Sequence, residues 1–130
     1  MLQNVGLADS HTHSRCSFDG SEPVRALGEA AERKGLRCLT VTDHYDCNCF
    51  DLPILLGTAL ASSQETAECA QAMQGRLTVL FGAELGQPLQ APAAAEAVVT
   101  RDTFTSGNSA SPARTSSRKT SSAAVRPSAG

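Results

Sequence analysis

The sequence predicts an α/β protein with parallel strands, and three observations support this. Three short apolar runs, at residues 4–8, 36–41 and 77–81, have the composition of buried strands. The segments between them are too long for hairpins and contain helical patterns, which is typical of strand–helix units in a layered or barrel arrangement. Each run is followed by a polar phrase, and in such folds reactive groups collect at the carboxyl ends of the strands.

The first strand is expected over residues 4–8, and a helix follows it. Ser21 is the expected N-cap of this helix, Pro23 fits its first turn, and Gly35 closes it as a C-terminal cap. One face carries apolar residues at spacings of three and four: Val24, Leu27, Ala30 and Ala31.

The second strand is expected in "LRCLTVTDH" and the third in "RLTVLFGAE", because both are rich in residues that suit a buried, pleated surface. A second helix is expected over about residues 63–74, ending before Gly75. These elements give the order strand, helix, strand, helix, strand.

The composition changes after Pro88, so we expect two parts: a domain over 1–88 and a tail over 89–130. Ala, Ser, Thr, Pro and Gly dominate the tail. Such a segment buries too little apolar surface to offset its chain entropy, which predicts disorder. The tail also looks like an out-of-frame translation of GC-rich coding sequence joined to a shortened domain.

The charge distribution argues against a nucleic-acid partner. Residues 1–88 hold six basic and eleven acidic side chains, whereas residues 89–130 hold five basic and two acidic ones. An acidic first part suits a cation site better than a polyanion groove. The basic residues of the tail are sparse and lack interleaved aromatic residues.

The cysteine count and the hydropathy pattern indicate where in the cell the protein is expected. The chain has five cysteines, an odd number without regular spacing, and "MLQNVGLADS" is not a signal peptide. The longest apolar run, "LPILLGTALA", is about half of what a membrane span needs. We therefore expect a cytoplasmic protein without a membrane partner.

The segment "DSHTHSRCSFDG" predicts half of a metal site. Side chains alternate along an extended segment, so His11 and His13 point to the same side. Two imidazole nitrogens facing one way suit a divalent metal. Asp9 could orient one ring or bind directly, and a turn could fold Asp19 back to the same ion.

Two later phrases complete the predicted site. His44, preceded by Asp43, ends the second strand, and Glu84 ends the third, where it could bridge two ions. Taken singly, each of these residues is more often a cap or a surface group than a ligand. Their placement at three successive strand ends favours a shared site, and mixed imidazole and carboxylate donors favour Zn, Mn or Fe.

The phrases "DSHTHSRCSFDG", "LTVTDH" and "GAELG", in this order and spacing, resemble the early motifs of the PHP (polymerase and histidinol phosphatase) family. The segment from "DSHTH" to "TDHYDCN" most resembles the histidinol-phosphatase branch. The resemblance covers roughly residues 5–88. It implies the N-terminal portion of a distorted (β/α)7 barrel holding two or three Zn, Mn or Fe ions.

The resemblance also implies an activity and residue roles. The reaction is hydrolysis of a phosphate monoester, in this branch L-histidinol phosphate in histidine biosynthesis, without a protein nucleophile. The implied metal ligands are His11, His13, Asp19, His44 and Glu84. Asp9 and Asp43 resemble residues that support these ligands.

The chain departs from the family pattern after the third motif. The family has further histidines and a closing Asp-x-His, whereas no histidine follows His44 here. We therefore expect a weakly folded chain with little phosphatase activity of its own. Two other functions stay open: another PHP activity, such as a polymerase-associated exonuclease or nucleotide phosphoesterase, and a non-catalytic metal-binding fragment. The sequence leaves the oligomeric state open.

Overall fold

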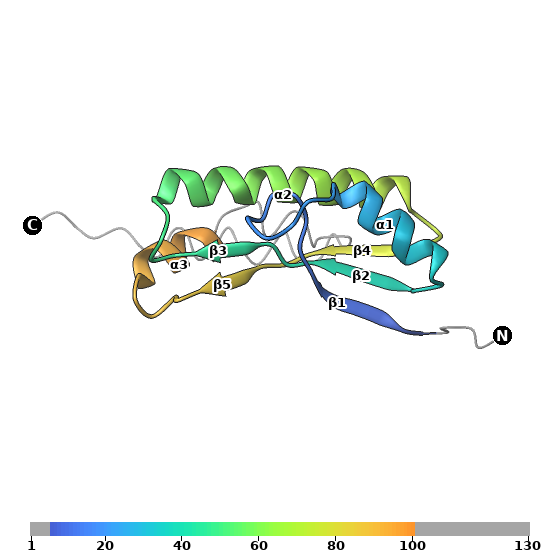
Figure 1. Ribbon diagram of the computed structural model, residues 1–130, viewed down its shortest axis with the longest axis horizontal. Coiled ribbons are helices and arrows are strands. Elements are labelled where there is room, and N and C mark those ends of the chain that lie inside the picture. The colour runs from blue at the N-terminus through green and yellow to red at the C-terminus, as the bar shows by residue number, and fades with distance from the viewer. Residues whose placement is uncertain (1–5, 101–130) are drawn as a thin grey trace, which may run out of the picture.

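A computed structural model describes residues 6–100 of the chain, and its elements alternate between short strands and helices (Figure 1). The strands all pair in parallel, which confirms the mixed α/β class predicted from the sequence. In chain order the elements are β1 (Ala8–Thr12), α1 (Val24–Arg33), β2 (Cys38–Val41), β3 (His44–Asp46), α2 (Leu52–Ala72), β4 (Thr78–Phe81), β5 (Glu84–Gly86) and α3 (Pro92–Thr100).

The strands form two small sheets. Strands β1, β2 and β4 form one sheet in that order, while β3 and β5 form a second sheet of two strands. Helices α1 and α2 lie along one side of the strands, and α2 spans both sheets (Figure 1). Within residues 6–100 the strands do not close into a barrel.

The second and third predicted strands are confirmed: each begins within two residues of its predicted start. The first predicted strand is displaced toward the C-terminus. β2 and β4 end at the predicted residues, Val41 and Phe81. β1 begins only at Ala8, where the predicted strand ends, so the motif "DSHT" lies inside the strand. Residues 4 and 5 of the predicted strand lie outside the described residues. Polar residues can form this strand because β1 is an edge strand, exposed along most of its length.

The predicted N-cap of α1 is wrong, and the predicted C-cap is confirmed. The helix begins at Val24 with Pro23 in the cap position, not Ser21. The Val24 amide instead donates to Oε1 of Glu65 in α2 (3.4 Å). At the other end Gly35 has a φ of 75°, and its amide and the following one donate back to the last turn, which is the Schellman ending of a helix.

Helix α2 is much longer than predicted. It begins at Leu52, eleven residues before the expected start at residue 63, and ends at Ala72. Asp51 is the N-cap residue and Pro53 lies in the first turn, where its missing N–H costs nothing. The Leu-rich run before residue 63 carries no clear polar face, which is why its helical period was not evident in the sequence.

The prediction of disorder from residue 89 onward is wrong for Pro92–Thr100. These residues form α3, and Ala95 and Val98 of this helix are buried. An Ala-rich segment of low complexity can form a helix because Ala has the highest helix propensity, and α3 gains its packing from α2. Residues 101–130 lie outside the described residues, and the frameshift origin of the tail stays a hypothesis.

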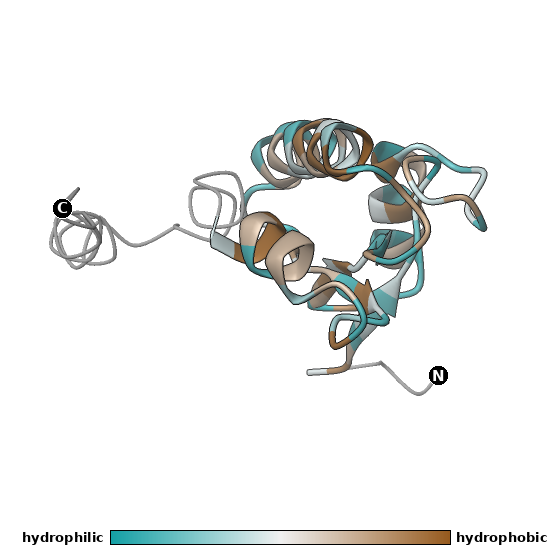
Figure 2. Ribbon diagram, turned by 90° about the vertical axis from the view of Figure 1, so that its left-hand side faces the viewer, coloured by the Kyte–Doolittle hydropathy of each residue, from teal (hydrophilic) through white to brown (hydrophobic). Residues whose placement is uncertain are grey.

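The core is divided into two clusters along α2. One lies between α1, α2 and the three-stranded sheet, and the other between α2, α3 and the two-stranded sheet. Viewed along the long axis, the helices and strands lie around a common centre (Figure 2). Among the described residues no helix has the length and hydrophobicity needed to cross a bilayer.

Candidate metal centre

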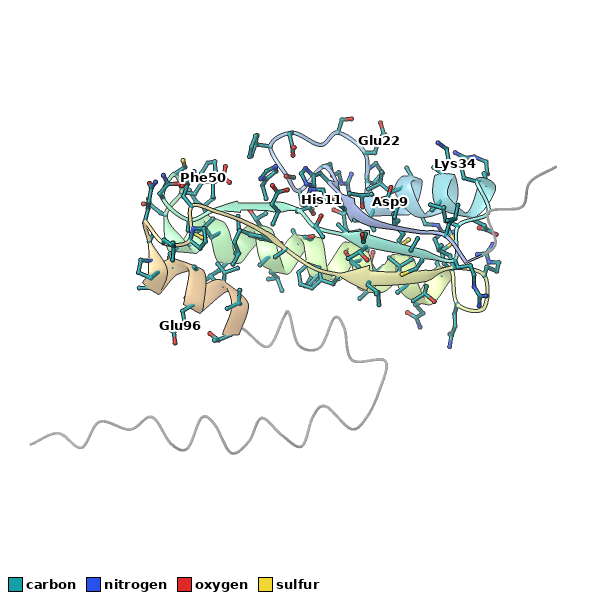
Figure 3. The ribbon with its side chains drawn as sticks, turned by 90° about the horizontal axis from the view of Figure 1, so that it is seen from below. Asp9, His11, Glu22, Lys34, Phe50 and Glu96 are labelled. Atoms are coloured by element: carbon teal, nitrogen blue, oxygen red, sulfur yellow. The ribbon has the colours of Figure 1, made fainter. Side chains whose placement is uncertain are left out.

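An irregularity in β1 positions the His-x-His pair. Asp9 pairs with Leu39 and Thr12 with Val41, so β1 has one residue more than β2 between these pairs. Such a bulge redirects side chains locally. His11 and His13 point to the same side as predicted, with their Nε2 atoms 3.0 Å apart. Figure 3 labels Asp9 and His11 along β1.

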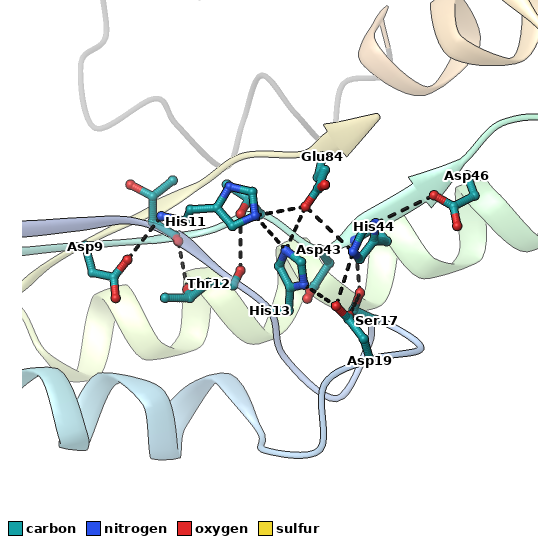
Figure 4. Close-up of polar contacts among 12 residues, drawn as sticks. Asp9, His11, Thr12, His13, Ser17, Asp19, Asp43, His44, Asp46 and Glu84 are labelled. Carbon is teal, nitrogen blue, oxygen red and sulfur yellow. Dashed lines mark hydrogen bonds and ion pairs between the residues drawn. The ribbon is translucent and has the colours of Figure 1, made fainter. Parts of the chain in front are cut away.

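His13 lies at the centre of the site (Figure 4). Its Nδ1 is 2.7 Å from Oδ2 of Asp19, and its Nε2 is 2.8 Å from Oε2 of Glu84. Its side chain is only 16% exposed, whereas that of His11 is 63% exposed. His11 therefore forms the solvent side of the site.

His44 and Glu84 are held opposite each other by backbone pairing. They are register partners at the start of β3 and β5, and the Glu84 amide donates to the carbonyl of Asp43 (3.0 Å). Both residues begin short strands of their own and do not follow β2 and β4 as loop residues. This pairing leaves Nε2 of His44 3.7 Å from Oε2 of Glu84.

A tight turn brings Asp19 back to the site, as predicted. The Ser17 hydroxyl donates to Oδ1 of Asp19 (2.7 Å) and accepts from the His44 amide (3.0 Å). Gly20 is required next to this turn, because a Cβ at this position would overlap the carbonyl oxygen of Ser14. Oδ2 of Asp19 then lies 3.2 Å from Nε2 of His44.

The structure thus brings all five predicted ligands together. Within each of two overlapping groups the potential ligand atoms lie within 4.8 Å of one another. Neighbouring ligands of a tetrahedral zinc ion, with bonds of 2.0–2.1 Å, lie about 3.3 Å apart, close to the distances of 2.8–3.2 Å between several of these atoms. The groups are His11, His13 and Glu84, and His13, Asp19 and His44.

The arrangement of lone pairs favours a cation at this site. With Nδ1 of His13 donating to Asp19, the Nε2 lone pair of the neutral ring faces Oε2 of Glu84. This carboxylate oxygen is buried and accepts no hydrogen bond from the described residues. Two facing lone pairs repel each other unless a proton or a metal ion lies between them, so the donor set fits a divalent ion.

The carboxylates also shift the pKa values within the site. Burial alone lowers the pKa of His13, but Asp19 and Glu84 outweigh it and raise the pKa above its usual value. Burial raises the pKa of Asp19, yet hydrogen bonds from Ser17 and His13 lower it overall to about 2. Asp19 is therefore a carboxylate at neutral pH, the form that binds metal.

The two predicted supporting carboxylates do not contact the imidazoles. Asp9 accepts a hydrogen bond from the backbone amide of His11 (3.2 Å) and not from a ring. Asp43 is fully buried and accepts from the amide and hydroxyl of Ser14 (2.5 and 2.7 Å) and from the hydroxyl of Ser62 (2.6 Å). Any orienting effect of Asp43 on His13 therefore runs through the neighbouring Ser14. That either carboxylate supports catalysis stays a prediction.

Several residues around the site were missed in the sequence. Ser14 and Ser17 lie inside the first motif, and their spacing to Asp19 is a turn signal that could have been noticed. Asp46, 3.6 Å from the buried Nδ1 of His44, is two residues beyond it on β3. Ser62 and Glu65 on α2 carry no local signal, because they reach the site region only through folding.

A parallel α/β fold in which imidazole and carboxylate groups converge where two small sheets meet is typical of a class of metal-binding proteins. The family described as the PHP domain matches residues 9–114, most of the chain. The chain therefore belongs to the PHP family, a family of metal-dependent phosphoesterases. The match extends past residue 88 and includes α3. No curated protein and no solved structure gives a significant match.

Proposed function

We propose that this chain binds divalent metal through the two overlapping groups and that its reaction is the hydrolysis of a phosphate monoester. The observation that carries the proposal is the convergence of His11, His13 and His44 with two carboxylates in a PHP-family chain. Mixed nitrogen and oxygen donors support Zn, Mn or Fe.

The residues of the two groups are expected to have different roles. His13, at the centre, belongs to both groups, while the exposed His11 leaves one side of the site open to substrate. Bound divalent ions lower the pKa of water and neutralise phosphoryl oxygens during in-line displacement. The hydroxyls of Ser14 and Ser17 near the site donate to Asp43 and Asp19 and hold these carboxylates in place. The proposed hydrolysis uses water, and not either serine, as the nucleophile.

We further propose L-histidinol phosphate as the substrate, giving L-histidinol and phosphate. The motifs from Asp9 to Asn48 support this through their resemblance to the histidinol-phosphatase branch. We expect a small-molecule substrate, no nucleic-acid partner and a cytoplasmic location. Turnover by this chain is expected to be slow. The family pattern has further histidine ligands, whereas the three histidines of this chain are all already in the two groups.

Metal binding tests the first part of the proposal. Competition with a chromophoric chelator should show zinc binding by the wild-type chain, and His13→Ala should weaken it at least about 100-fold, more than the loss of a residue that only orients a ligand. Glu84→Gln should also weaken it strongly. Glu96→Gln, an exposed glutamate on α3, is the matched control and should change nothing. Equal zinc affinities of the wild-type chain and of the His13→Ala and Glu84→Gln variants would contradict the site.

Phosphate release tests the second part. Zinc- or manganese-loaded chain should release inorganic phosphate from L-histidinol phosphate faster than the His13→Ala variant does. Preference for a nucleotide or an oligonucleotide would assign the chain to another PHP activity. Metal binding without any release above the variant's background would favour a non-catalytic metal-binding role.

A further inference from the structure

A cavity adjoins the metal centre on the side of His44. It has a volume of about 230 Å³ and lies between the loop after β1 and the first turns of α2. His44 and Ser17, both part of the site region, are among the residues that line it. A molecule in this cavity would therefore reach the atoms that surround the two ligand groups.

The walls of the cavity are largely apolar and partly aromatic. Phe18, Phe50 and Ile54 line it, and each is a large apolar side chain left substantially exposed. The Phe18 ring lies 4.7 Å from the ring of His44, with the planes tilted by 36°. Apolar side chains that are exposed together beside a polar site are typical of a ligand-binding surface.

The cavity has no unpaired charged side chain among the described residues that line it, so its lining does not favour a charged ligand. Arg15 lines it, but its Nε donates to Oε2 of Glu65 (3.2 Å), which neutralises the guanidinium locally. The thiol of Cys16 also lines it, and burial raises the pKa of this thiol to about 11, so it is uncharged near neutral pH. The remaining lining residues, Leu55 and Thr58, are neutral.

We propose that this cavity binds the alcohol part of the substrate, and that it selects phosphate monoesters whose alcohol carries a flat, uncharged ring. The inference rests on the proposed function, since the phosphoryl group would lie at the metal centre beside His44. The ring would stack among Phe18, Phe50 and Ile54, and the volume suits one five- or six-membered ring with a short linker. A neutral imidazole and a phenyl group both belong to this class.

Calorimetric titration of the zinc-loaded chain tests the selection. Benzyl phosphate should bind at least about tenfold more tightly than glycerol 1-phosphate, because its ring buries apolar surface in the cavity. Thr58→Trp, which fills the cavity, and Phe50→Ala, which removes a wall, should both abolish that difference while zinc affinity stays unchanged. Leu60→Trp, an exposed position on α2 outside the cavity, is the matched control and should keep the difference. Equal affinities for the two esters would overturn the inference and leave the proposed function standing.

A second titration separates the cavity from the metal centre. Benzyl alcohol added to the metal-free chain should shift the amide NMR signals of Phe18, Phe50 and Thr58, whereas propane-1,2-diol should not. The shifts should disappear in Thr58→Trp, whose folding is checked by circular dichroism. If zinc and phosphate fail to bind but these shifts occur, the proposed function fails and the ring site stands. If the shifts are absent, the ring site is overturned.

Discussion

The two ends of α2 stabilise different parts of the molecule. Its C-terminal half, with Cys69 and the C-cap residue Met73, packs into a cluster of eight buried residues that includes residues of β2 and β4. Its N-terminal half, with Leu55 and Ala59, packs into a cluster of only four buried residues. The second cluster holds β3, β5 and α3, the short elements that follow the main sheet.

This difference shows how a small core can support a reactive site. The ligands lie at the junction of the two clusters, where His11 comes from the first sheet, His13 directly follows β1, and His44 and Glu84 come from the second sheet. The larger cluster fixes one pair and the smaller cluster fixes the other. The geometry of the site therefore depends on the weaker half as much as on the stronger half.

The largest expected change in the free energy of unfolding comes from truncating one buried leucine to alanine in each cluster. Leu39 and Leu55 are both 2% exposed. Leu39→Ala should lower the free energy of unfolding by about 4 kcal/mol, and Leu55→Ala by about 2.5 kcal/mol, because the cavity left in the smaller cluster collapses more easily. Urea denaturation followed by circular dichroism measures both values.

The control for this pair is Leu89→Ala, since Leu89 is 92% exposed and its loss should cost almost nothing. A larger loss for Leu55→Ala than for Leu39→Ala would show that the second cluster carries the fold, and the comparison would be reversed.

The same division explains what could be predicted from the sequence. In the first cluster, β2, β4 and α1 have clear apolar periods, and Gly35 ends α1 as expected. In the second, β3 and β5 are three residues each, too short for a period to be seen, and the apolar run that starts α2 has no polar face. Their structure comes from tertiary contacts, which local propensity does not contain.

The site was more predictable than the fold around it. Histidines and carboxylates are few, their chemistry is specific, and Asp19, His44 and Glu84 converge with the His-x-His pair as expected. The residues that hold them could not be predicted in the same way. Ser62 acts through Asp43 from 19 residues away, and nothing in a local window identifies such a contact.

The next largest effect tests whether the two clusters are coupled through Asp43. Asp43→Ala leaves two buried serine hydroxyls and the Ser14 amide without their acceptor, and should cost about 3 kcal/mol of unfolding free energy. It should also weaken zinc binding by about 10-fold to 100-fold, because Ser14 directly follows His13. Chelator competition and urea denaturation measure the two effects.

A pair of neighbouring serines isolates the contribution of α2 to this network. Ser62→Ala removes one donor to Asp43 and should cost about 1 kcal/mol. Ser63→Ala removes only a hydrogen bond to the Leu60 carbonyl within the helix and should cost less. Equal costs for the two variants, with no change in zinc affinity, would show that the Asp43 network does not join α2 to the site.

An effect of similar size is expected for Glu65, which links α2 to the loop after β1 and to the start of α1. It accepts hydrogen bonds from Arg15, Cys16 and the Val24 amide. Burial raises its pKa, but the hydrogen bonds from Cys16 and Arg15 outweigh this and lower it overall. Glu65→Gln should reduce the free energy of unfolding by about 1 kcal/mol at pH 7.

The contribution of Glu65 to the free energy of unfolding should depend on pH. A carboxylate whose pKa is lower in the folded state stabilises the protein above its unfolded pKa, about 4.3 for Glu, and this contribution is lost as the pH falls through the folded pKa. The difference between wild type and Glu65→Gln should therefore shrink when denaturation is measured at pH 3 in place of pH 7. Glu68→Gln, an exposed glutamate one turn further along α2, should show no such difference. A gap that stays constant from pH 7 to pH 3 would mean that Glu65 acts through its shape and not through its charge.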